Sequence, residues 1–258
     1  MTNTRMTMLC GFCMICLIAA IMPVASALGN GTAWNNNPEH ITAMKANVAY
    51  TGAIGQAQMD GAISYIGTVS NGAGTSQLSS IESQFTGTES SAGSMTAADQ
   101  IKAAETQMSS DRKEFMTTAK GSLKEYNGTA KALRESINAS VMAQSGTIQN
   151  LRNTWWTDRE TARMDEFAQN DQNRNNVLAK LTAKGVDVSQ AQAIENQIQQ
   201  EGTDLKAGFD SQDGNAVKAA NQQLATLCNQ FRDIVKGYRT AHPAKATVTP
   251  AAAVPATV

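Results

Sequence analysis

The residues best suited to recognition chemistry are two adjacent tryptophans, Trp155 and Trp156, followed by Arg159 and Arg163 on later helical turns. Large aromatic side chains with nearby arginines dominate the binding energy of many protein interfaces. Adjacent helical residues point about 100° apart, so both tryptophans can be buried only where two helices flank their own. One interpretation is therefore a partner-binding site. The other places one tryptophan in a helical seam and covers its neighbour with an arginine stem.

Other patterns that resemble ligand sites are incomplete. Asp171, Asn173 and Asn175 have the spacing of the first ligands of a calcium loop. Asn176 and Thr182 stand, however, where that loop requires glycine and glutamate. The glycine-rich turns in the first third of the chain lack both the lysine and the preceding strand of a phosphate-binding loop. We therefore expect no bound metal and no nucleotide.

Catalysis is not indicated by the side chains available. A nucleophilic Cys228 would need a histidine partner, but the two histidines, His40 and His242, lie near the two ends of the mature chain, in proline-flanked segments. Acidic pairs such as Asp165 and Glu166 lie among basic residues on a helix. We expect a protein that is not an enzyme and has no cofactor, with a hydrolase built from carboxylates alone as the remaining enzymatic alternative.

Three Asn-x-Ser/Thr triplets, at Asn30, Asn127 and Asn138, are potential acceptors for N-linked glycans. A chain rich in Asn, Ser and Thr contains some such triplets by chance. They become relevant only if the cell of origin glycosylates its secreted proteins.

Residues 1–27 have the pattern of a secretory signal peptide. Arg5 precedes an apolar run from Leu9 to Val24, and Ala25-Ser26-Ala27 supplies the small residues that a signal peptidase accepts. The apolar run of about 16 residues is shorter than the roughly 20 needed to cross a bilayer as a helix. We therefore expect cleavage and a secreted or cell-envelope protein. The segment would contact a membrane only if it stayed uncleaved as an anchor.

Cysteine content and charge limit the mature chain further. Signal cleavage would remove Cys10, Cys13 and Cys16 and leave Cys228 alone, which excludes an intrachain disulfide. Cys228 lies in an apolar helical stripe and is expected to pack as a small buried side chain. The whole chain has 21 basic and 22 acidic side chains and a formal net charge of −1. That balance gives no electrostatic attraction to nucleic acid.

The elements that must position these residues are expected to be helices. No proline occurs between Pro38 and Pro243, and a proline costs about 3 kcal/mol inside a helix. Aromatic residues make up only 5% of the chain, which does not favour a thick globular core. These features predict an all-α, elongated antiparallel helical bundle with coiled-coil-like packing.

Residues 28–95 are expected to form an N-terminal helical segment with Gly/Ser-rich loops. Four small residues in it are spaced by four, which allows another helix to approach closely; they are Ala49, Ala53, Ala57 and Gly61.

Residues 96–240 are expected to form a long-helix and helical-hairpin domain. Apolar residues between Ile101 and Trp155 follow steps of three and four, close to a seven-residue repeat. We therefore predict one long central helix over residues 96–183. If it kinks or divides, the glycines mark where, at Gly121, Gly128 and Gly146.

Short turns at Gly185 and around residues 211–213 predict that two further helices pack as antiparallel neighbours of the long one. Residues 241–258 are mostly Ala, Thr, Pro and Val. Because such a composition cannot bury a core, we expect a disordered tail.

These features favour a structural or protein-interaction module that contacts an unknown protein partner or a second copy of itself through helical seams. The alternative is an extracytoplasmic chaperone or carrier that binds apolar ligands between its helices. An open, continuous apolar groove would support the carrier, and a closed seam would oppose it.

Overall fold

The computed structural model describes residues 37–241. The expected signal peptide, Asn30 and residues 242–258 of the expected tail lie outside the described residues. Within residues 37–241 the chain forms seven α-helices and no strand, which confirms the all-α prediction. They are α3 (Pro38–Ser70), α4 (Ser76–Ala92), α5 (Ala98–Glu125), α6 (Ala130–Ala143), α7 (Ser145–Thr182), α8 (Ser189–Asp210) and α9 (Gly214–Ala241).

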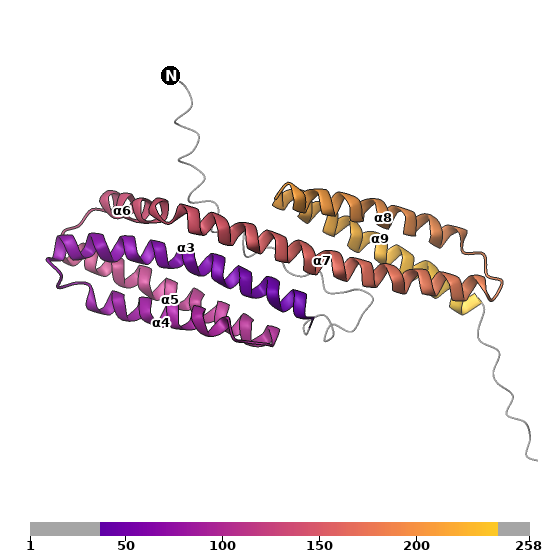
Figure 1. The fold of residues 1–258 in the computed structure, drawn as a ribbon, viewed down its shortest axis with the longest axis horizontal. Helices are drawn as coiled ribbons and strands as arrows, with labels where there is room; N and C mark the ends of the chain where they lie inside the picture. Colours follow the sequence, from indigo (N-terminus) through magenta and orange to yellow (C-terminus); the bar gives the residue numbers. More distant parts are fainter. Residues whose placement is uncertain (1–36, 242–258) are drawn as a thin grey trace, which may run out of the picture.

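The helices form an elongated body of two bundles placed end to end (Figure 1). In the first bundle α3 packs against α4 and α5 on one side and against α6 and the beginning of α7 on the other. In the second bundle α8 and α9 pair with each other beside the later part of α7. Helix α7 therefore belongs to both bundles, and it is the element that carries Trp155 and Trp156.

Each bundle has its own apolar core. The first core is buried between α3, α4, α5 and α6, spans residues 41–133 and so crosses the boundary expected at 95/96. The second is built from α7, α8, α9 and the α7–α8 turn. The side chains most completely enclosed in these cores include Ile66, Phe85, Phe115, Ile198 and Leu205.

The long helix expected over residues 96–183 is instead three helices. The chain reverses after α5, where Asn127 adopts a left-handed conformation with φ of 54°. The Thr129 side chain then caps α6 by accepting a hydrogen bond from the Ala132 amide at 3.3 Å. A second break falls at Gln144, between α6 and α7. The heptad-like pattern thus arises from separate helices that fold back onto α3, and Gly128 lies at the turn.

The row of small residues does bring α3 and α6 close together. A Cβ atom added to Gly61 would lie 2.6 Å from the Cα of Ile137, which leaves no space for any side chain. The Ser136 hydroxyl also donates to the carbonyl of Gly61 at 2.7 Å. On another face of α3, a Cβ atom on Gly55 would lie 2.5 Å from the ring of Phe85.

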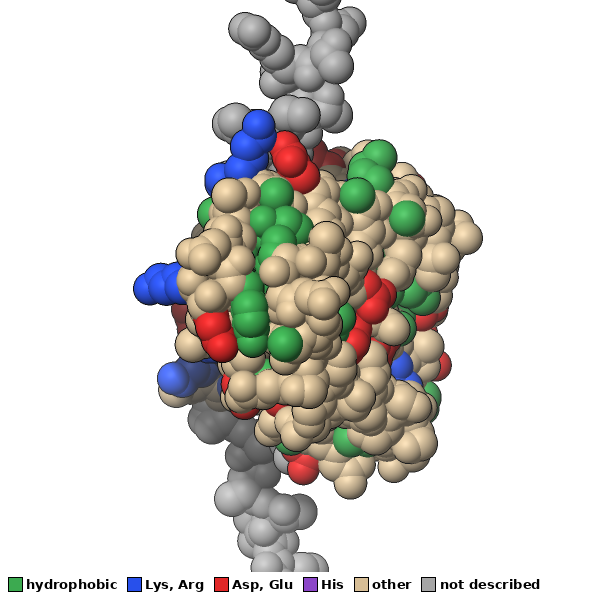
Figure 2. Space-filling view, turned by 90° about the vertical axis from the view of Figure 1, so that its left-hand side faces the viewer, with side chains coloured by type: hydrophobic (Ala, Val, Ile, Leu, Met, Phe, Trp, Pro, Cys, Tyr) green, Lys and Arg blue, Asp and Glu red, His purple; other side chains and the backbone are tan. Residues whose placement is uncertain are grey.

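One end of the molecule is formed by the α3–α4 and α5–α6 connections. Figure 2 looks onto this end and shows a narrow band of hydrophobic side chains, surrounded mostly by backbone and by side chains that are neither hydrophobic nor charged. Part of the packing here is aromatic, because the Tyr126 ring occupies the space that a side chain on Gly74 would need. No helix in residues 37–241 is long and apolar enough to span a membrane.

Candidate functional site

The tryptophan pair lies where the two bundles meet. The Trp155 ring stacks on Tyr50 of α3, with ring centroids 5.6 Å apart and planes inclined by 14°. The Trp156 ring meets Phe209 of α8 edge to face, at 5.9 Å and 73°. The two tryptophan rings are 5.2 Å apart. One dipeptide on α7 therefore contacts an aromatic ring from each bundle, and we call Tyr50, Trp155, Trp156, Arg159 and Phe209 the aromatic junction.

The aromatic junction is mostly inside the protein. Trp156 and Tyr50 are each only 6% exposed, and Trp155 is half-buried. A partner-binding site would need both tryptophans to be substantially exposed in the isolated protein. The structure instead gives them neighbours from α3 and α8, because two helices flank α7 at this level.

Arg159 is held by rings rather than by a carboxylate. Its guanidinium carbon lies 5.4 Å from the ring centroids of both tryptophans and 5.6 Å from that of Phe209. Burial, followed by the positive charge of Arg163, lowers the pKa of Arg159 to about 10. The side chain therefore stays charged at neutral pH, where the electron-rich faces of the rings attract it.

Two buried donors in the junction have no hydrogen-bond partner among the described residues. They are Nη1 of Arg159 and Nε1 of Trp156. A buried donor without a partner costs roughly 1–3 kcal/mol. Aromatic packing and the cation–π contacts must offset that cost for the junction to form.

Arg163 continues the contact toward α9. Its Nε donates to Oδ1 of Asn221 at 2.9 Å, and its guanidinium also pairs with the buried Glu166. Asn221 in turn donates to the carbonyl of Val217 at 2.9 Å. The structure thus places all four residues of the predicted interaction site on one length of α7, with Arg163 directed at α9.

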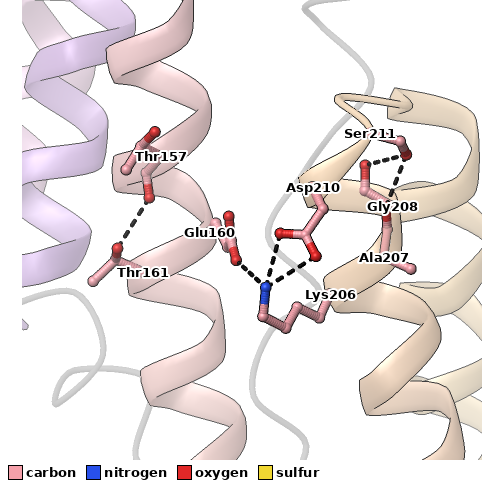
Figure 3. Close-up of polar contacts among 8 residues, drawn as sticks. All are labelled: Thr157, Glu160, Thr161, Lys206, Ala207, Gly208, Asp210 and Ser211. Atoms are coloured by element: carbon pink, nitrogen blue, oxygen red, sulfur yellow. Dashed lines mark hydrogen bonds and ion pairs between the residues drawn. The ribbon is translucent and has the colours of Figure 1, made fainter.

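A surface ion-pair group joins α7 to α8 beside the junction (Figure 3). The ammonium of Lys206 lies 3.1 Å from Glu160 of α7 and 2.8 Å from Asp210 of its own helix. Both carboxylates raise the pKa of Lys206, Asp210 more than Glu160. The lysine is about half exposed, so solvent weakens this contact relative to the buried junction.

A second polar group, which the sequence did not reveal, lies inside the second bundle. Arg174 and Glu195 are each 2% exposed, and Nε of Arg174 lies 2.6 Å from Oε2 of Glu195. Gln199 donates to the other Glu195 oxygen at 2.8 Å and also to Asp171. Asp171, the first residue of the calcium-like pattern, therefore serves this network. The sequence offered one sign of this group: Arg174 lies seven residues before Leu181, at a position of the helical seam where an apolar residue is expected.

The remaining predicted residues have simple surroundings. Cys228 is a half-buried free thiol packed against the second core, and burial raises its pKa. Asn127 and Asn138 are both exposed, at the α5–α6 turn and on α6. In the described part of the chain, no three His, Cys, Asp or Glu side chains gather as a metal site.

A shallow groove of about 430 Å³ runs between α3 and α4. Its lining mixes the charged Lys45 and Glu89 with the apolar Val48 and Ala49. It is therefore not the continuous apolar groove expected of a carrier for apolar ligands.

Comparisons with models of known protein families, with curated proteins and with solved structures found no match in any of the three.

Proposed function

We propose that this protein is a secreted or cell-envelope structural module, a stiff helical spacer that holds bound protein partners a fixed distance apart. The observation that supports this is the sharing of α7 by both bundles. Helix α7 has 38 residues, which at 1.5 Å per residue gives a length of about 57 Å. A single helix of that length sets the separation of whatever binds at its two ends.

The aromatic junction supplies the stiffness. Bending α7 near Trp155 would pull this ring away from Tyr50 of the first bundle, and bending near Trp156 would separate it from Phe209 of the second. An aromatic pair contributes about 0.5–1.5 kcal/mol beyond its buried area. A cation–π contact such as that of Arg159 adds about 0.5–2 kcal/mol. Together these contacts make a bent α7 a minor state.

The distribution of apolar side chains favours the spacer over a carrier. Among the described residues, the large apolar side chains that stay exposed are Met116, at 36%, and Met142, at 70%. The groove between α3 and α4 is lined in part by the charged Lys45 and Glu89. A carrier that binds apolar ligands would need a groove that this packing does not leave open.

Chemical cross-linking in intact cells of origin tests the proposal. Exposed lysines mark both ends of the body: Lys120 and Lys124 on α5, and Lys180 near the end of α7 with Lys184 in the turn that follows it. We expect reproducible cross-links from both ends to other proteins, with some copies linked at both ends at once. A double variant, Tyr50→Ala with Trp155→Ala, should lose the species that is cross-linked at both ends. The control variant Gln172→Ala, at an exposed position of α7, should keep that species. Cross-links confined to this chain itself would contradict a spacer.

A further inference from the structure

The groove between α3 and α4 is large enough for a small molecule. It is lined by one face of each helix, with residues at helical spacing: Lys45, Val48, Ala49 and Gln56 on α3, and Thr86, Glu89, Ser90 and Gly93 on α4. The short side chains at Ala49 and Ser90, and the lack of one at Gly93, leave space between the two helices. The resulting hollow of about 430 Å³ lies within the range of roughly 300–1,000 Å³ that small-molecule sites occupy.

The groove contains one positive and one negative side chain that do not pair with each other. Lys45 and Glu89 are both partly buried, and neither forms an ion pair or a side-chain hydrogen bond with another described residue. The Glu89 carboxyl group lies instead against the backbone of α3, in the space that a side chain on Gly52 would need. Burial raises the pKa of Glu89, and an ammonium group bound beside it would favour the ionised form.

Neutral polar groups in the same groove are also available to a ligand. The Gln56 amide and the Ser90 hydroxyl make no side-chain hydrogen bond within the part of the chain that the structure describes. The Thr86 hydroxyl donates to the carbonyl of Glu82 at 3.1 Å, which leaves its oxygen able to accept a hydrogen bond. A bound molecule would therefore find both donors and acceptors between the two charges.

The positions of the charges define how a ligand would be oriented. Glu89 lies in the last turn of α4, where the helix dipole adds partial negative charge and no basic side chain offsets it. Lys45 provides the positive charge on the α3 side. A ligand with a single charge would meet a like charge in the groove, whereas a ligand with one charge of each sign would not.

We propose that this groove binds a small zwitterion, an α-amino acid whose carboxylate contacts Lys45 and whose ammonium group contacts Glu89. The ammonium group also donates to the hydroxyl oxygens of α4, and an aliphatic side chain lies on the apolar surface of Val48 and Ala49. This site belongs to the first bundle alone. It goes beyond the spacer function and does not depend on it.

Titration of the mature chain with L-leucine, followed by its amide signals in nuclear magnetic resonance, tests the site. We expect shifts centred on Ala49 and Ser90, with a Kd of about 1 mM or tighter. N-acetyl-L-leucine lacks the ammonium group and L-leucinamide lacks the carboxylate. Because each analogue loses one charged contact, each should bind about tenfold more weakly than L-leucine.

Two variants connect each ligand group to its residue. Glu89→Gln should weaken L-leucine about tenfold and should not weaken N-acetyl-L-leucine, which has no ammonium group to lose. Lys45→Met should weaken L-leucine to the same extent and should not weaken L-leucinamide. The matched control Glu114→Gln, at an exposed position on α5, should bind all three compounds as the wild type does.

The comparison of the three compounds uses the wild-type chain, so it decides the proposal even if a variant does not fold. Absence of shifts at about 10 mM L-leucine would overturn the proposal. So would equal affinities for L-leucine and its two analogues, or shifts centred away from α3 and α4. A folded Glu89→Gln that binds L-leucine as tightly as the wild type would also contradict it.

Discussion

Replacing Trp156 by alanine should lower the free energy of unfolding by about 3–5 kcal/mol. The side chain is 6% exposed, and a buried tryptophan removes up to about 250 Å² from water. Alanine loses roughly 150 Å² of that burial, which at about 25 cal/mol per Å² amounts to about 4 kcal/mol. The lost contact with Phe209 adds about 1 kcal/mol. Deleting the buried, unpartnered indole N–H returns a similar amount.

Urea unfolding followed by far-ultraviolet circular dichroism measures this change. Trp155→Ala serves as the matched comparison, and because Trp155 is more exposed than Trp156, it should cost less. Trp156→Phe should cost less than Trp156→Ala, since it keeps a ring against Phe209 and removes the indole N–H. A Trp156→Ala protein within about 1 kcal/mol of the wild type would refute the packing role. A larger loss of stability for Trp155→Ala than for Trp156→Ala would show that Trp155, and not Trp156, is the tryptophan whose burial stabilises the fold.

Three further substitutions or treatments have outcomes that the structure specifies. Gly61→Ala should destabilise the fold by about 1–3 kcal/mol, because α6 must move away from α3. Gly121→Ala, at a glycine with open space around it, should stabilise the fold by about 0.5–1 kcal/mol. Equal melting temperatures for the two variants would contradict the close α3–α6 contact. Glu195→Leu should cost about 3–5 kcal/mol, because it removes the 2.6 Å partner of the buried Arg174 and leaves only the 3.7 Å contact with Asp171, and adding Arg174→Met should recover most of the loss; additive losses in this double-mutant cycle would show that the pair is not coupled. Reducing agent should leave the melting temperature of the chain without residues 1–27 unchanged, because Cys228 is free; a drop of several degrees would reveal a disulfide between chains.

The helical class and several helix ends were predictable because local chemistry decides them. Asn37 caps α3 through its side chain, which accepts from the Glu39 amide at 2.8 Å, and Pro38 occupies the first turn. Gly185 takes a positive φ of 75° after α7. Asp213 accepts hydrogen bonds from the first amides of α9.

The division of the expected long helix depends on tertiary packing. A stripe with steps of three and four is equally consistent with one long helix and with shorter helices folded onto a neighbour. Here α6 gains a closer contact by lying on Gly61 of α3. The turn chemistry of Asn127 and Gly128 was visible in the sequence, but the partner surface was not.

The roles of the site residues were only partly predictable. The sequence showed that Trp155 and Trp156 could not share one seam, but which of them is enclosed depends on the position of Phe209 on α8, far along the chain. Pairing of Arg174 with Glu195 also joins two helices. A charged residue in an apolar stripe indicates a buried partner without identifying it.

The stiffness of the junction is tested most directly by double electron–electron resonance between spin labels on the two bundles. Lys113→Cys on α5 and Lys218→Cys on α9 are exposed positions, and Cys228→Ser removes the remaining thiol from a chain without residues 1–27. If α7 and its aromatic junction hold the bundles as one body, the wild-type background should give a single narrow distance distribution. That distribution should broaden when Tyr50→Ala and Trp155→Ala are added. A broad or multiple distribution with the junction intact would contradict a stiff spacer.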